Sequence, residues 1–197
     1  MILWTFQPIE IWNLIRETGT YRCDPAKCSM PEFADAYQWL IRQMEQRIGP
    51  RPNGVEYPVW AWYMQNGKQR KPDLRSERWG YGQGDEDYVC IELEIPDEQV
   101  LLSDFDDWHA VLNNWILTDS MEESDRLEVY LESLPPNEQK AFREHNWEQV
   151  LLPAPAEVAP SDDGKWVQAT FWELRKDMVR DVRFFRTGKR KREDVTS

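Results

Sequence analysis

Short stretches that alternate large apolar side chains with small or polar ones most constrain what this chain can fold into. In the stretch VQATFWEL, Gln168, Thr170 and Trp172 fall on one face of an extended strand, and Ala169 and Phe171 fall on the other. Other segments carry apolar residues at helical spacing. Because strands and helices follow one another without a repeated unit, the pattern predicts a mixed α+β fold. The predicted strands are residues 1–7, 55–63, 88–95 and 165–174, and the predicted helices are residues 9–18, 32–48, 104–117 and, as a divided pair, 120–152.

The chain length of 197 residues suits a single α+β domain over residues 1–197. A helical insertion is predicted at about 118–152, divided at Pro135-Pro136, and a basic, solvated tail at 186–197. The polar, glycine-rich residues 64–87 predict a mobile loop that borders a cleft, since loops of this length often serve function. A further extended piece, residues 178–185, is expected to pair beside strand 165–174.

The composition excludes several classes of function. The net charge of −12 repels a phosphate backbone, so general nucleic-acid binding is not expected. No apolar run approaches the roughly 18–20 residues of a membrane span, and no basic segment of a secretory signal precedes the first apolar stretch. Without an export signal, Cys23, Cys28 and Cys90 are expected to be reduced thiols in a cytoplasmic protein. Their spacing and the scarcity of histidine argue against a zinc site.

A first cluster of candidate site residues lies near the N-terminus. Thr5 and Gln7 are interleaved with aromatic residues on the first predicted strand, beside Trp4, and Tyr21 and Arg22 follow on a second short extended piece. Because an arginine can bind two oxygens of one anion, these residues suit a ligand that carries phosphate. The alternative is an ordinary strand with a surface arginine.

A second cluster joins two tryptophans to a basic loop. Trp60 and Trp62 share a face of the strand 55–63, and Lys71, Asp73 and Arg75 follow in the loop. Two aromatic rings beside basic side chains suit a planar ring with an anionic tail. The alternative is that both rings belong to the core and that the loop is merely solvated.

A third cluster surrounds the start of the helix 104–117. Ser103 is predicted to cap this helix, and the aspartates of 104–107 match the sign of the helix dipole. His109 and Asn113 lie four residues apart on one face, which allows a general base oriented by an amide. The alternatives are a capped surface helix and a metal-dependent nuclease or hydrolase. No bound metal is expected, because hard cations require more oxygen ligands from a shaped loop.

The fourth cluster, Gln168, Thr170 and Glu173, lies on the last predicted strand. Gln168 and Thr170 share a face with Trp166 and Trp172. An ordinary sheet face is the alternative to a ligand-binding role.

The chain resembles a bacterial family known as the domain of unknown function 3841. The stretches that suggest it are LWTFQ, YRCD, AYQWLIRQMEQRIGP, YPVWAW, KPDLR, VLLSDFDDWHAVLNNW and VQATFWEL, which span nearly the whole sequence. This resemblance implies no function.

The stretch LWTFQPIEIWNLIRETGTY also resembles the opening of the ADP-ribosyltransferase superfamily, in its DNA-modifying toxin branch. The stretches IELEIPDEQVLLSD and VQATFWELRKDMVRDVRFF resemble the middle and closing strands of that branch. By position, Trp4 stands for a tyrosine, Thr5 for a histidine and Gln7 for a threonine. Gln168 matches a late glutamine, and Thr170 falls where a catalytic glutamate is expected.

The second resemblance implies a fold in which two small antiparallel or mixed sheets with flanking helices surround a cleft that binds NAD or a related nucleotide. Trp4, Thr5 and Gln168 would then lie near one another. The enzyme would release nicotinamide and transfer ADP-ribose, but a threonine cannot stabilise a developing cation as a carboxylate does, so turnover would be slow or absent. The implied catalytic residues are Thr5, Gln168 and Thr170, and the implied cofactor-binding residues are Trp4, Gln7, Tyr21, Arg22, Trp60, Trp62, Arg75 and His109.

The alternative function is a non-enzymatic binding protein on the same scaffold, whose acidic, tryptophan-rich face holds a protein or a small ligand. The missing carboxylate at position 170 favours this alternative. The sequence leaves the oligomeric state open.

Overall fold

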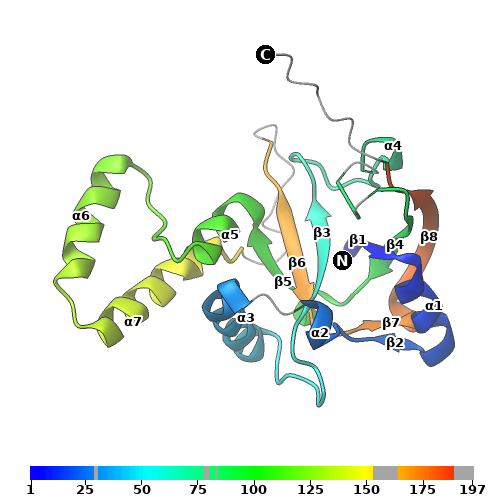
Figure 1. Ribbon diagram of the computed structural model, residues 1–197, viewed down its shortest axis with the longest axis horizontal. Helices are drawn as coiled ribbons and strands as arrows, with labels where there is room; N and C mark the ends of the chain where they lie inside the picture. The colour runs from blue at the N-terminus through cyan, green and yellow to red at the C-terminus, as the bar shows by residue number, and fades with distance from the viewer. Residues whose placement is uncertain (29–30, 78–79, 83, 153–163, 189–197) are drawn as a thin grey trace.

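The computed structural model describes residues 1–28, 31–77, 80–82, 84–152 and 164–188 (Figure 1). The described strands are β1 (Ile2–Pro8), β2 (Thr20–Tyr21), β3 (Val59–Met64), β4 (Asp87–Glu94), β5 (Leu101–Asp104), β6 (Val167–Phe171), β7 (Leu174–Arg175) and β8 (Val179–Arg186). The described α-helices are α1 (Ile9–Thr18), α2 (Pro25–Cys28), α3 (Ala34–Arg47), α4 (Leu74–Glu77), α5 (Phe105–Leu112), α6 (Met121–Glu132) and α7 (Pro136–Asn146). Short 3₁₀ turns occupy Pro31–Phe33, Asp97–Gln99, Trp147–Val150 and Lys176–Met178.

The main sheet has six strands in the order β5-β6-β3-β1-β4-β8, and every neighbouring pair is antiparallel. A separate two-stranded ladder joins β2 to β7. The mixed α+β class is therefore confirmed, and each of the four predicted strands overlaps a described one. The predicted strand 55–63 begins only at Val59, and the predicted strand 165–174 ends at Phe171. The expectation of two small sheets is not met, because one sheet has six strands and the other has two.

The main sheet is weakly joined at its centre, between β1 and β3. Their register contains the single pair Trp4 and Trp62, whereas β1 and β4 share seven pairs and β3 and β6 share five. Beyond Trp4 the two strands part. The sheet therefore consists of two three-stranded halves, β5-β6-β3 and β1-β4-β8, with an opening between them.

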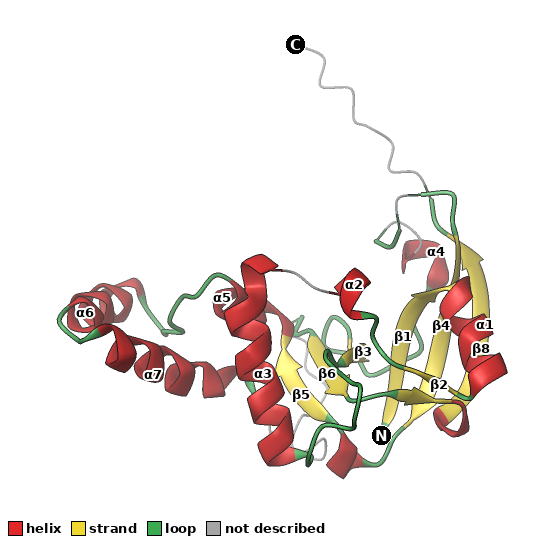
Figure 2. Cartoon of the chain, turned by 60° about the horizontal axis from the view of Figure 1, so that its bottom comes forward, coloured by secondary structure: helices red, strands yellow, loops and turns green. Residues whose placement is uncertain are grey.

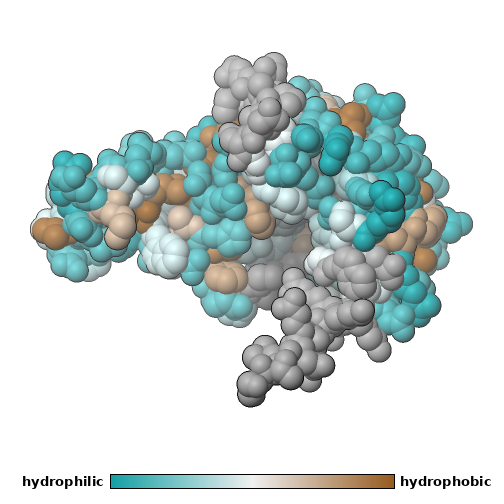
Figure 3. Space-filling view, turned by 90° about the horizontal axis from the view of Figure 1, so that it is seen from above, coloured by the Kyte–Doolittle hydropathy of each residue, from teal (hydrophilic) through white to brown (hydrophobic). Residues whose placement is uncertain are grey.

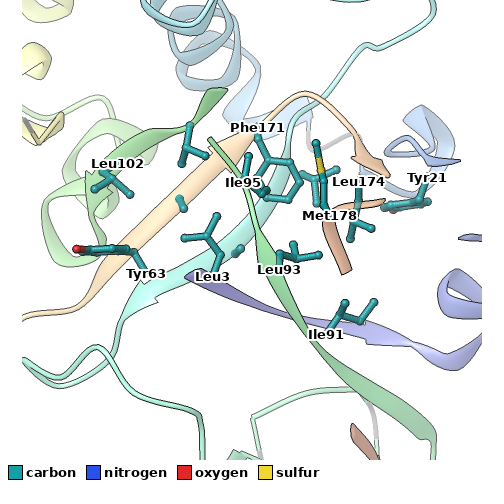
Figure 4. Packing of buried hydrophobic residues seen from close by; sticks show 14 of the residues in the cluster. Leu3, Tyr21, Tyr63, Ile91, Leu93, Ile95, Leu102, Phe171, Leu174 and Met178 are labelled. Atoms are coloured by element: carbon teal, nitrogen blue, oxygen red, sulfur yellow. The ribbon is translucent and has the colours of Figure 1, made fainter. Parts of the chain in front are cut away.

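The two faces of the main sheet bury different sets of side chains. On one face, Leu3, Ile91 and Phe171 pack with residues of α1 and of the β2–β7 ladder (Figure 4). On the other face, α3 and α5 cover the half that contains β5 and β6 (Figure 2). The segment 65–86, which joins β3 to β4 and is called the covering segment below, packs Leu74 and Tyr81 over the half that contains β1 and β4.

Residues 178–185 do not pair beside β6, so that prediction is wrong. Their strand, β8, pairs with β4 at the opposite edge of the sheet. The reason is that both edges of β6 are occupied, one by β5 and the other by β3. The chain reaches β8 through β7, which pairs with β2.

The predicted pair of helices, α6 and α7, forms an arm of residues 118–146 that projects from the rest of the molecule (Figures 1 and 2). Ser120 caps α6 by accepting a hydrogen bond from the Glu123 amide at 3.2 Å. Pro135 and Pro136 divide the helices as expected. In α6 the one buried side chain is Leu131, and in α7 none is buried.

The cysteines differ from expectation. Cys23 is disulfide-bonded, so the expectation of three reduced thiols is wrong, whereas Cys90 is a free and buried thiol. Among the described helices, none has both the length and the apolar character needed to cross a bilayer.

Candidate functional site

A cavity of about 230 Å³ lies where β1 and β3 part. It is lined by side chains from β1, β3, β6 and the covering segment: Thr5, Phe6, Gln7, Trp60, Ala61, Trp62, Tyr81 and Gln168. Five of these were expected from the sequence to bind a ligand, namely Thr5, Gln7, Trp60, Trp62 and Gln168. Of Trp4, Thr5 and Gln168, which were expected to lie near one another, Thr5 and Gln168 line the same cavity and Trp4 does not.

The polar side chains of β1 bridge the opening. The Thr5 hydroxyl donates a 2.9 Å hydrogen bond to the backbone carbonyl of Trp60, and the Gln7 amide Nε2 donates to the Thr5 hydroxyl at 2.8 Å. Thr5 is 2% exposed. The first bond joins β1 to β3 where their backbone ladder is missing, and the second, within β1, holds the Thr5 hydroxyl in place. Thr5 is therefore part of the wall of the cavity.

Aromatic rings close the cavity on the side of the covering segment. The Trp62 indole Nε1 donates a hydrogen bond to the Tyr81 hydroxyl at 3.0 Å, and the Tyr81 ring stacks on Phe6 with centroids 4.4 Å apart. Burial raises the pKa of the Tyr81 phenol, which keeps it neutral. Tyr81 was missed from the sequence, where the one signal was an aromatic residue between two glycines in WGYGQG.

The two tryptophans of β3 serve different clusters. Trp62 packs against Phe105 and Trp166, with centroids 5.1 and 5.3 Å apart. Trp60 packs against Trp108 at 5.4 Å and belongs to the cluster beneath α3. Both rings are therefore partly core, as the alternative interpretation held, and both also line the cavity.

Gln168 presents hydrogen-bonding capacity that the described part of the chain does not use. Its side chain is 8% exposed, and its Nε2 is buried without a hydrogen-bond partner there. Thr170, two residues further along β6, is 1% exposed and does not line the cavity. Its hydroxyl donates to the Leu101 carbonyl at 3.4 Å.

Trp4 and Tyr21 lie outside the lining of the cavity. Trp4 is register partner to Trp62, and its indole Nε1 donates to Glu92 at 3.2 Å. Tyr21 belongs to the core beneath α1, where burial raises its pKa.

The two predicted arginines are already paired. Arg22 binds Glu173 at 3.0 Å and donates to the Asn53 carbonyl at the same distance. Arg75 is 91% exposed and binds Asp73 at 2.6 Å; hydrogen bonds from this guanidinium lower the pKa of Asp73 to about 2.

The helix α5 does not form the predicted base-and-amide pair. Asn113 Nδ2 donates to the backbone carbonyl of His109, so the amide does not orient the imidazole. The imidazole Nδ1 lies 2.9 Å from the Phe105 carbonyl. The helix is capped by Asp104 rather than Ser103, since the Asp104 carboxylate accepts bonds from the amides of Asp106 and Asp107. Within the described residues, no cluster of three or more histidine, cysteine, aspartate or glutamate side chains could hold a metal ion.

The covering segment is fixed to the main sheet by charge. Lys71 pairs with Asp181 of β8 and lies 3.7 Å from Glu92 of β4. Arg183 of β8 donates to the Pro72 carbonyl at 2.9 Å. The prediction that this loop borders the cavity is confirmed through Tyr81, and its mobility stays a prediction.

Fold and cavity together define a mixed α+β protein with a ligand-sized cavity where its main sheet parts. The chain belongs to the family described as Domain of unknown function (DUF3841), whose model matches residues 2–180. No curated protein and no solved structure matches the chain. The family description states no function, so the role of the cavity is argued from its geometry.

Proposed function

We propose that this protein binds NAD or a related nucleotide in the manner of an ADP-ribosyltransferase, with the ring end of the ligand in the cavity between β1 and β3. The observation that carries the proposal is the opening of the main sheet at the residues expected to bind the ligand, Thr5, Gln7 and Gln168. The resemblance implies a cleft between two small sheets, whereas this cavity lies within one six-stranded sheet, so the support comes from the lining residues and not from the number of sheets.

The size of the cavity limits what enters it. Pockets that bind drug-sized ligands measure about 300–1,000 Å³, whereas this cavity measures about 230 Å³. A single ring fits, and the phosphates of a dinucleotide would lie outside. Trp60 and Trp62 offer aromatic surface to the ring, and Gln168 Nε2 offers a donor. For Arg22 to bind a pyrophosphate, its ion pair with Glu173 would have to open.

The lining favours binding over chemistry. None of the eight lining residues has a carboxylate. Removing one group that stabilises developing charge commonly slows an enzyme by about 10²–10³. We therefore propose slow or absent release of nicotinamide from bound NAD.

Thermal shift and calorimetry with NAD, ADP-ribose and ATP test this function. A ligand at 100 times its dissociation constant adds about 2.7 kcal/mol of stability. Gln168→Ala should weaken binding, whereas Arg180→Ala, which removes a half-exposed side chain that pairs with Glu94 outside the cavity, should not. Absence of any shift with the wild-type protein would refute nucleotide binding.

A second candidate function, binding of a protein partner, is favoured by the arm. Trp115 at its root is 63% exposed, Met121 and Val129 are 85% and 69% exposed, and apolar side chains are visible on its surface (Figure 3). Large apolar side chains exposed on a projecting element offer contact area to a partner. Chemical cross-linking in a cell extract tests it: Val129→Lys should abolish arm-dependent cross-links that Gln168→Ala retains.

A further inference from the structure

Two buried polar side chains, Ser103 and Gln168, lie side by side with hydrogen-bonding capacity that the fold leaves unused. They are register partners in the antiparallel pair of β5 and β6, so their side chains project from the same face. Ser103 is 1% exposed and Gln168 is 8% exposed. In the described part of the chain, neither Ser103 Oγ nor Gln168 Nε2 has a hydrogen-bond partner. Native proteins seldom leave such groups unpaired, because each one destabilises the fold.

Neighbouring polar side chains on the same face do not bond to Ser103 Oγ or Gln168 Nε2, because they form other hydrogen bonds. The register continues from Ser103 and Gln168 to Trp62, whose indole N–H binds Tyr81. Two residues further along β6, the Thr170 hydroxyl donates to the Leu101 carbonyl. Ser103 also has no capping role, since Asp104 caps α5. Among the described residues, the other buried side-chain atom without a partner is Gln65 Nε2, which follows β3 and does not line the cavity. The unused capacity next to the cavity therefore belongs to Gln168, which lines it, and to Ser103, which does not line it and adjoins it through Gln168.

The charge of the surroundings narrows the class of ligand. The eight residues that line the cavity are all uncharged. A phosphate or carboxylate placed there would be buried without a counter-charge, which is strongly unfavourable. An amide N–H₂ such as Gln168 Nε2 requires an acceptor, and a serine hydroxyl can donate or accept. A neutral amide carbonyl meets both requirements, and the flat aromatic walls suit a planar ring.

We propose that Gln168 and Ser103 form a polar subsite that binds the carbonyl of an uncharged planar amide, either a carboxamide on an aromatic ring or the lactam of a nucleobase. The inference rests on the proposed function in using the same cavity. It adds Ser103 as a binding residue. It also excludes a ligand that would place an anionic group against Gln168 and Ser103.

Calorimetry with a matched pair of probes tests the ligand class. Nicotinamide and nicotinic acid have nearly the same shape, but nicotinic acid carries a carboxylate. Wild-type protein should bind nicotinamide at least about tenfold more tightly, because one good hydrogen bond and the avoided burial of a charge each contribute about that factor. Gln168→Leu should lose about tenfold in nicotinamide affinity, and Ser103→Ala a few-fold. The control is Gln43→Leu, since Gln43 is also 8% exposed but bonds to Arg47 outside the cavity.

The melting temperatures of the ligand-free variants distinguish a binding role of the two side chains from a structural role. If the two groups serve a ligand, Gln168→Leu and Ser103→Ala should keep or raise the melting temperature of the free protein. A fall of more than about 2 °C in both variants would show a structural role and overturn the inference.

The remaining outcomes distinguish the inference from the proposed function. Equal affinity for nicotinamide and nicotinic acid, with NAD still bound, would overturn the subsite and leave nucleotide binding intact. Selective binding of nicotinamide without binding of NAD or ADP-ribose would support the subsite and refute the nucleotide. Binding of none of the probes would overturn both.

Discussion

Thr5 shows how one side chain can hold a sheet together where its ladder fails. Its hydroxyl donates to the Trp60 carbonyl at 2.9 Å and accepts from Gln7 at 2.8 Å. Thr5→Val keeps the shape and removes both bonds, so we expect the free energy of unfolding to fall by about 1–3 kcal/mol in urea titrations. Thr170→Val is the matched control. Thr170 is equally buried but makes one long bond of 3.4 Å, and its loss should be smaller. Equal losses would show that Thr5 does not bridge the opening.

Cys90 provides a prediction about pH at the same scale. Burial raises the pKa of its thiol from 9.0 to about 11. A raised folded pKa stabilises the fold below the unfolded value, and the stabilisation is lost as pH rises from 9 to 11. Wild-type protein should therefore lose stability relative to Cys90→Ala across this interval. Peptide mapping after alkylation at pH 8 should find Cys90 protected in the folded protein and labelled in urea. Labelling as rapid as in urea would contradict the burial.

Individual site residues could be predicted where the alternation of a strand shows which face of the sheet a side chain occupies. Trp62 and Gln168 were expected on ligand-facing sides and meet across β3 and β6. Tyr81 could not be predicted, because a residue in a long loop has no periodicity that says what it packs against. The pairing of Arg22 with Glu173 was missed for a similar reason, since it joins residues 151 positions apart.

At the scale of elements, local patterns predicted which segments are strands but not which strands are neighbours. The alternation in residues 178–185 is the same whether they pair with β6 or with β4. β8 cannot pair with β6, because β5 and β3 already occupy both edges of β6, and this arrangement is not visible in the sequence of residues 178–185. Helix starts were predictable to within two residues, since α3 begins at Ala34 instead of residue 32 and the cap of α5 is Asp104 instead of Ser103. The end of α5 was not, because the helix stops at Leu112 instead of residue 117.

Lys71 contributes one of the attachments of the covering segment to the main sheet. Hydrogen bonding to Asp181 raises the pKa of Lys71, and the same bond lowers the pKa of Asp181. Lys71→Met should speed amide exchange modestly in residues 65–77 while leaving β4 unchanged, because exposed ion pairs contribute little individually. Molar salt should have the same effect on wild-type protein. Lys68→Met is the control, since Lys68 forms no ion pair with the described residues. Unchanged exchange in Lys71→Met would place the attachment in the Arg183 bond to Pro72 and in the packing of Leu74 and Tyr81.

At the scale of the whole molecule, the arm is an addition whose two ends meet. The side chain of Asn146 binds Leu117 twice, accepting from its amide at 2.6 Å and donating to its carbonyl at 2.9 Å. Trp147 just beyond donates to the Trp115 carbonyl. The chain thus leaves the body and returns at one point, which is the geometry of a tolerated insertion. The sequence predicts two helices here from the Ser120 cap and the break at Pro135-Pro136, but not that the ends of the arm are joined.

Deletion of residues 118–145, with a short glycine linker in their place, should therefore leave the main sheet folded. The arm buries one side chain from α6 and none from α7, so little core is lost. The bond from Trp39 to the Glu144 carbonyl and the pair between Arg42 and Glu144 would disappear. We expect a melting temperature lower by a few degrees, with near-ultraviolet circular dichroism and cavity binding retained. Asn146→Ala in the full chain should loosen the root of the arm and raise amide exchange there. If the shortened chain failed to fold while Asn146→Ala remained stable, the arm would be part of the folding unit, because it would then supply stability that its contacts with the body do not account for.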